Sequence, residues 1–109
     1  MLTFETLVEE LVAEACRDEV GLWMIASQVR RELSMYSPAD VKTASLEVVR
    51  RMLESQRVQA GYYNPDGSGV VRWNAPISSV LSKIADEWTL LGREPGIGEV
   101  VVFVGAEVG

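Results

Sequence analysis

The stretch GYYNPDGSGVVRW, residues 61–73, does most to decide the fold of this chain. Two runs rich in β-branched and aromatic residues, 57–63 and 70–73, flank a cluster of Asn, Pro, Asp, Gly and Ser. Strand-forming runs on both sides of such a cluster are typical of a β-hairpin with a polar tip. The hairpin directly follows a helical pattern that carries Arg50 and Arg51, which raises the question of what the two elements bind.

Amphipathic spacing of apolar residues predicts four helices along the chain. The third has the clearest start, because Ser37 is a good N-cap and Pro38 occupies the first helical position. The β-branched run EVVVFV predicts a third strand of the sheet. The expected elements are helices over residues 4–16, 18–33, 38–55 and 76–91, and strands over residues 57–63, 70–73 and 99–104.

The order α-α-α-β-β-α-β predicts an α+β fold with a small three-stranded antiparallel sheet, and the 109 residues form one domain, residues 1–109. Three helices followed by a hairpin resemble a small winged-helix domain over about residues 18–75. That resemblance implies a short strand between the first two helices, for which the sequence offers no candidate, and residues 100–104 are expected to replace it. Longer segments, including GLWMIASQVRREL and ADEWTLLGREPGIGEVVVFV, are similar to small bacterial proteins of about this length, which implies a common fold and no particular activity.

The composition excludes most catalytic chemistry. The chain has no histidine and a single cysteine, Cys16. Ser-His and Cys-His nucleophiles, histidine-based metal sites, cysteine-cluster zinc sites and internal disulfides all need residues that this sequence lacks. Asn64, Asp66 and Ser68 are spaced like the first half of a calcium loop, but their flanks predict strands, and a turn explains them. We therefore expect a non-enzyme without cofactor or metal.

The charge distribution bounds the kind of partner. The net charge is −6. Only the middle third, residues 38–75, is not negatively charged overall, because it has five basic and four acidic side chains. An acidic surface attracts basic partners and repels polyanions. The N-terminal segment is acidic from Glu5 onward, unlike a signal peptide, and no apolar run reaches the roughly 20 residues of a membrane helix. We expect a cytoplasmic protein with no membrane contact.

These features predict a non-catalytic protein-interaction module with a basic partner, such as an immunity-type inhibitor of a cationic toxin or nuclease. Carboxylates repeat at helical spacing along the first helix and form an acidic face. Exposed aromatic rings beside acidic residues are typical interface anchors, and in the hairpin one of two successive tyrosines is expected to face the core and the other solvent. The candidate protein-binding residues are Glu5, Glu9, Glu10, Glu14, Trp23, Tyr62 and Tyr63.

The alternative is a winged-helix transcriptional regulator, acting as a homodimer, that reads DNA through helix 38–55 and hairpin 57–73. DNA-binding proteins of this kind neutralise roughly 6–10 phosphates, and the cations available here are interspersed with carboxylates. Arg50 and Arg51 are equally explained as partners of glutamates on a solvated helix face. The net charge therefore disfavours nucleic acid. The candidate DNA-binding residues are Lys42, Thr43, Arg50, Arg51, Arg57 and Arg72.

Overall fold

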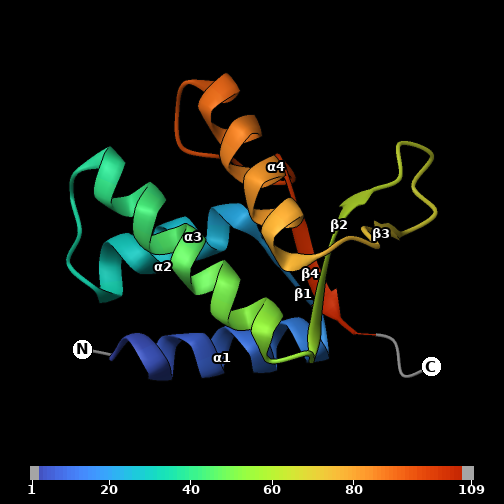
Figure 1. Ribbon diagram of the computed structural model, residues 1–109, viewed down its shortest axis with the longest axis horizontal. Coiled ribbons are helices and arrows are strands. Elements are labelled where there is room, and N and C mark those ends of the chain that lie inside the picture. The colour runs from blue at the N-terminus through green and yellow to red at the C-terminus, as the bar shows by residue number, and fades with distance from the viewer. Residues whose placement is uncertain (1–2, 107–109) are drawn as a thin grey trace.

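The computed structural model describes residues 3–106 and shows an α+β fold of four helices and a four-stranded antiparallel sheet (Figure 1). The helices gather on one side of the sheet, and the hairpin extends from the opposite side. The elements, in chain order, are α1 (Phe4–Arg17), β1 (Glu19–Gly21), α2 (Leu22–Glu32), α3 (Pro38–Glu54), β2 (Val58–Tyr63), β3 (Val70–Arg72), α4 (Ile77–Leu91) and β4 (Val102–Gly105).

Local signals in the sequence set the helix ends. The Thr3 hydroxyl accepts a hydrogen bond from the N–H of Thr6 and caps α1. The Ser37 hydroxyl accepts one from the N–H of Asp40 at 3.5 Å and caps α3, as predicted. Gly92 ends α4 with a φ of 69°, a left-handed conformation that glycine adopts without steric cost.

The predicted three-stranded sheet is wrong, because Glu19–Gly21 forms an additional strand where a helix beginning at Asp18 was expected. The strand order is β1-β4-β2-β3, with β4 paired to both β1 and β2. The C-terminal strand therefore joins the strand between the first two helices and does not replace it. A three-residue strand is too short to show a period-two pattern in the sequence, and Val20 is held by its position opposite Phe103 on β4.

The core lies between the helices and one face of the sheet. Val20, Phe103 and Ala60 form a row across β1, β4 and β2, and all three are buried against the apolar stripes of the helices. Helix α3 occupies the centre of the helical layer, where it contacts α1, α2 and α4 (Figure 1). Only a narrow strip of α3 is consequently left for solvent.

The hairpin between β2 and β3 has the predicted polar tip. The N–H of Asn64 donates to the carbonyl of Gly69 at 2.8 Å, and the N–H of Gly67 donates to the carbonyl of Asn64 at 2.9 Å. The Asp66 carboxylate accepts hydrogen bonds from the side chain and from the N–H of Ser68, which in that order hold its pKa below the ordinary value. The Asp66 carboxylate therefore stabilises the turn itself.

Gln56 offers a test of the backbone at the end of α3. Its φ of 63° is a left-handed conformation that is unfavourable for residues with a Cβ, and its side chain is exposed. Gln56→Gly is expected to raise the free energy of unfolding by about 1 kcal/mol, measured by urea denaturation. Gln56→Ala keeps the Cβ and should give no comparable gain; equal gains from both variants would contradict this explanation.

Candidate functional site

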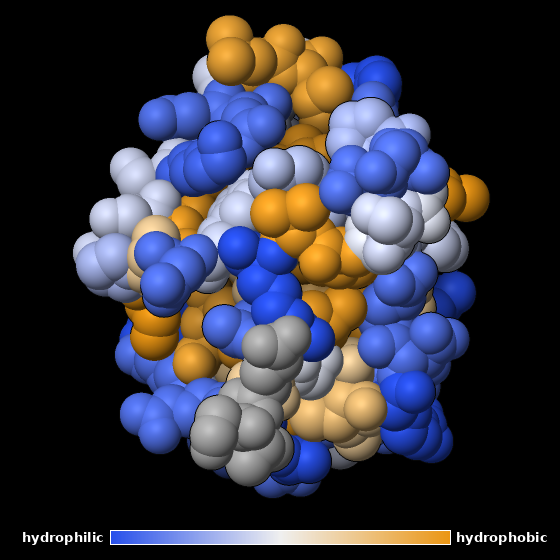
Figure 2. All heavy atoms as spheres, turned by 90° about the vertical axis from the view of Figure 1, so that its right-hand side faces the viewer, coloured by the Kyte–Doolittle hydropathy of each residue, from blue (hydrophilic) through white to orange (hydrophobic). Residues whose placement is uncertain are grey.

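The sheet carries a second, smaller apolar layer on the face opposite the helices. Successive side chains of a strand point to opposite faces. Because Phe103 faces the helices, Val102 and Val104 lie on the other face, which we call the outer face. Both valines are buried, and neither belongs to the core cluster. Figure 2 views the molecule from the hairpin side and shows hydrophobic side chains within a hydrophilic rim.

Trp23 covers part of the outer face. Gly21 lies in β1 opposite Val102. A Cβ added to Gly21 would lie 2.6 Å from Cδ1 of Trp23, so the indole packs directly against the backbone of β1. A side chain at residue 21 would displace the ring. Trp23 remains half-buried there, and it does not pack against the core cluster, in line with its unclear place in the core pattern.

Tyr63 covers the outer face from the other side. Its hydroxyl donates a hydrogen bond to the Glu19 carboxylate at 2.5 Å. Glu19 lies in β1 and Tyr63 in β2, and β4 separates these strands in the sheet. The two side chains therefore meet over β4. Partial burial, followed by the hydrogen bond to Glu19 and the charges of Glu19 and Asp18, raises the pKa of Tyr63 to about 12.

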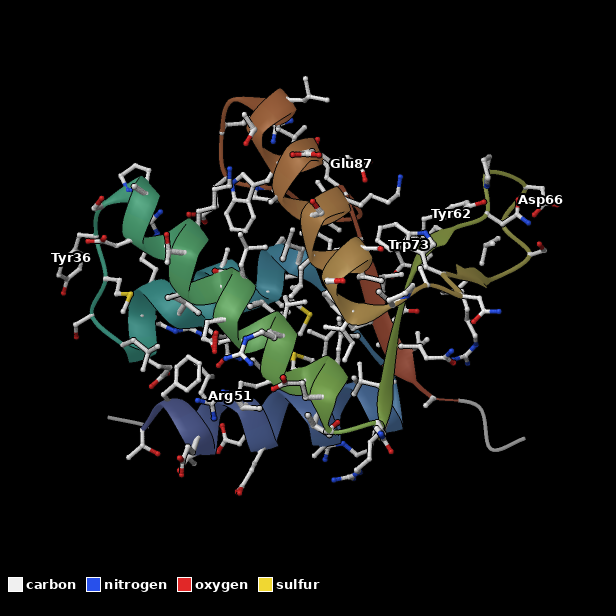
Figure 3. All side chains as sticks on the ribbon, viewed as in Figure 1. Tyr36, Arg51, Tyr62, Asp66, Trp73 and Glu87 are labelled. Atoms are coloured by element: carbon white, nitrogen blue, oxygen red, sulfur yellow. The ribbon has the colours of Figure 1, made fainter. Side chains whose placement is uncertain are left out.

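The expectation that one tyrosine of the hairpin faces the core is wrong. Tyr62 is 45% exposed and Tyr63 is 44% exposed. Tyr62 is on the same side of β2 as buried Ala60, but the end of the hairpin extends past the helices, which therefore do not cover the ring (Figures 1 and 3). The two tyrosine rings lie on opposite faces of β2, and only Tyr63 is on the outer face with Trp23.

The two candidate cations of the hairpin region, Arg57 and Arg72, differ in their contacts. The Arg72 guanidinium donates hydrogen bonds to the side-chain oxygen of Gln59 at 3.0 Å and to the carbonyl of Gly105 at 2.6 Å. Arg72 thereby ties the hairpin to the end of β4. Arg57 is exposed, and its carbonyl accepts a hydrogen bond from the thiol of Cys16 on α1.

The acidic residues of α1 lie on two flanks of the helix and not on the outer face. Glu5 and Glu9 line a shallow hollow beside Arg51 of α3. Glu10 and Glu14 line a separate hollow against α2, and Glu14 pairs with Arg17. The structure therefore separates these four carboxylates into two pairs, and it does not bring them together with Trp23 and the tyrosines.

The two arginines of α3, Arg50 and Arg51, form ion pairs with neighbouring glutamates. Arg50 donates to Glu47 at 2.8 Å and to Glu54 at 2.9 Å, and it holds the pKa of Glu47 below its ordinary value. Arg51 pairs with Glu47 at 3.4 Å and lies over the ring of Phe4, between α1 and α3 (Figure 3). The solvated ion-pair face considered for these arginines is present.

The other two DNA-binding candidates on α3, Lys42 and Thr43, differ in their contacts with α4. Lys42 donates a hydrogen bond to the Thr89 hydroxyl of α4 at 2.5 Å, whereas Thr43 is exposed. Helix α4 thus lies along the part of α3 that would face a duplex. Four of the six predicted DNA-binding residues, the cations Lys42, Arg50, Arg51 and Arg72, are thus bound to groups of the protein itself.

Comparison with protein-family models, with curated proteins and with solved structures finds no match to this chain. Within residues 3–106, no three or more His, Cys, Asp or Glu side chains gather as metal ligands. In the same part of the chain, no helix has the length and apolar character needed to cross a membrane.

Sequence reasoning identified Trp23 and Tyr63 but missed Glu19 and the two valines beneath them. The sequence predicts a helix at Glu19, so the contact of its side chain with Tyr63 across β4 could not be predicted. One signal was available: a glycine inside a strand marks a close approach of another group, and Gly21 and Gly61 are both in strands.

The ionisation of Tyr63 tests the geometry of the outer face. The absorbance difference between the wild type and Tyr63→Phe at high pH should have its midpoint near pH 12, against an ordinary value of 10.0. Because the folded pKa is raised, the stability that the neutral phenol contributes is present below pH 10 and is lost between pH 10 and about 12.

Glu19→Gln should lower the midpoint of Tyr63 without restoring the ordinary value, because partial burial remains. Asp66→Asn, at the hairpin tip, is the matched control and should leave it unchanged. An unchanged midpoint in Glu19→Gln would contradict the contact over β4.

Proposed function

We propose that this chain is a non-catalytic protein-interaction module that binds a basic partner through the outer face of the sheet. The observation that carries the proposal is the pair of half-exposed rings, Trp23 and Tyr63, which share the sheet face opposite the helices with two buried valines. Rigid aromatic side chains that are partly desolvated contribute much of the binding energy in protein interfaces.

The carboxylates beside the rings favour a basic partner, because Arg72, which shares the outer face through its pairing with Gly61, is engaged by Gln59 and the Gly105 carbonyl. Glu19 is tied to Tyr63 and lies next to Asp18 at the edge of the sheet. An arginine from a partner could pair with these carboxylates and stack on the Trp23 indole, which are the contacts that a planar guanidinium makes best. The net charge of −6 attracts such a partner from a distance, and the exposed carboxylates of α1 add to this field. An immunity-type inhibitor of a cationic toxin or nuclease is one form that this module would take.

The second candidate function is DNA binding, and one observation favours it. Strand β1 gives residues 4–72 the order α-β-α-α-β-β, which includes the short strand that the winged-helix resemblance implies. We propose that the fold is a winged-helix variant in which β4 is added between β1 and β2. Against the DNA function stand the pairing of Arg50 and Arg51 with glutamates and the packing of α4 beside Lys42.

The partner-binding proposal is tested with two exposed tyrosines. Tyr63 is part of the outer face, whereas Tyr36 is 76% exposed in the α2–α3 connection, far from the hairpin (Figure 3). A partner captured from the host by the wild type is identified, and its affinity is measured by calorimetry. Tyr63→Ala should weaken binding by about 2 kcal/mol, or roughly thirtyfold, and Tyr36→Ala should leave it unchanged. An acidic partner, or loss of binding only in Tyr36→Ala, would contradict the proposal.

DNA binding is tested by fluorescence anisotropy of a labelled mixed-sequence duplex at about 50 mM and about 200 mM salt. We expect no binding by the wild type at either concentration. Glu47→Gln releases both arginines from their shared carboxylate and is the variant in which weak binding should first appear. Micromolar binding by the wild type that falls steeply with salt, and that is lost in Arg50→Ala and Arg51→Ala, would favour the regulator instead.

A further inference from the structure

We propose that a second site, a pocket between α2, α3 and α4, binds a small aromatic monocarboxylate. The pocket has a volume of about 490 Å³, within the roughly 300–1,000 Å³ of small-molecule sites. It lies at the N-terminal end of α3 and the C-terminal end of α4, away from the hairpin (Figure 1). The inference goes beyond the protein-binding function and does not depend on it.

Apolar groups form most of the walls. Trp88 of α4 is 6% exposed and lines the pocket. Pro38 and Ala39, in the first turn of α3, face it across the pocket. Gly92 ends α4 in a left-handed conformation and turns the chain so that Arg93 and Glu94 also line the opening. A flat apolar ligand body would pack against these groups, and an aromatic ring suits the indole best.

Basic residues concentrate at this pocket. Arg30, Lys42 and Arg93 line it, which is three of the ten basic residues of an acidic chain. Arg30 pairs with Glu94, and Arg93 pairs with Glu99 through two hydrogen bonds of 2.6 and 2.7 Å. Lys42 has no carboxylate partner among residues 3–106. The site therefore carries one uncompensated positive charge.

The hydrogen bonds of Lys42 show how it would hold an anion. Its ammonium donates to the hydroxyl of Thr89 at 2.5 Å, and that hydroxyl donates to the carbonyl of Ala85 at 3.0 Å. The hydroxyl is thus fixed as an acceptor, and it holds the ammonium at the pocket. Of the three N–H donors of a lysine, two are left for a ligand, which matches the two oxygens of a carboxylate.

The charge count also selects against more highly charged ligands. A phosphate monoester carries close to two negative charges at neutral pH, whereas Lys42 supplies one positive charge. The carboxylates of Glu94 and Glu99 lie beside the two arginines and would repel the second charge of the ligand. A monoanion with an apolar body is therefore the class that this pocket fits.

The probe for this site is 2-naphthoate, and its neutral counterpart 2-naphthamide is the matched ligand control. In titrations of the ¹⁵N-labelled protein, 2-naphthoate should bind with a dissociation constant below about 1 mM. The shifted resonances should be those of Lys42, Thr89, Gly92 and the indole N–H of Trp88, assigned with Trp88→Phe. The amide should bind at least about tenfold more weakly, because it lacks the charge that pairs with Lys42.

Two protein variants complete the test. Lys42→Met should weaken 2-naphthoate at least about tenfold, while Lys83→Met is the control, because Lys83 is the other lysine of the chain and lies over Trp73 and beside Glu87. Ala39→Gln, at an exposed position, should block the pocket without disturbing the core. Absence of binding, equal binding of the amide, unchanged affinity in Lys42→Met, or shifts confined to the outer face would each overturn the proposal.

Discussion

The structure depends on the pairing of β4 with strands on both of its sides. Residues 101–104 are all buried, although successive side chains point to opposite faces. Val101 and Phe103 belong to the core, while Val102 and Val104 lie on the outer face, which also carries Trp23 and Tyr63. A strand with both faces covered needs a continuous apolar run, and VVFV is such a run. Without β4, β1 would have no partner, and the two halves of the outer face would not meet.

The elements that could be predicted from the sequence are those with local signals. Helix α3 shows this most clearly, because Ser37 and Pro38 mark its start and the apolar spacing continues for 17 residues. The hairpin could be predicted for the same reason, since every residue of its tip, residues 64–69, is of a type that favours turns. Strand β1 carries no such signal. Its three residues are held by pairing with β4, about 80 residues further along the chain, which is a tertiary effect that no local pattern reports.

The candidate site shows the same difference between local signals and tertiary contacts. Trp23 and Tyr63 could be singled out as aromatic residues without a clear place in a core pattern. Their meeting through Glu19 could not be predicted, because it requires the order β1-β4-β2. The cations of α3 show the reverse case. Their i, i+3 and i, i+4 spacing from Glu47 is visible in the sequence and indicates the ion pairs as one of two explanations, and the structure contains these pairs.

The placement of the cations connects the fold to its surface charge. Arg50 is engaged by carboxylates of its own helix, Arg72 ties the hairpin to β4, and Arg93 is engaged by Glu99. Because these cations are satisfied within the molecule, they contribute little attraction to a polyanion, and the field outside is set by the excess of carboxylates. Lys42 differs from them, since its ammonium donates to a hydroxyl, while Glu94 at the same pocket is paired with Arg30. The surface of this chain repels extended anions, but the pocket can still bind one small anion. Apolar groups of the pocket wall strengthen a single ion pair with Lys42, whereas the repulsion from distant carboxylates is screened by salt.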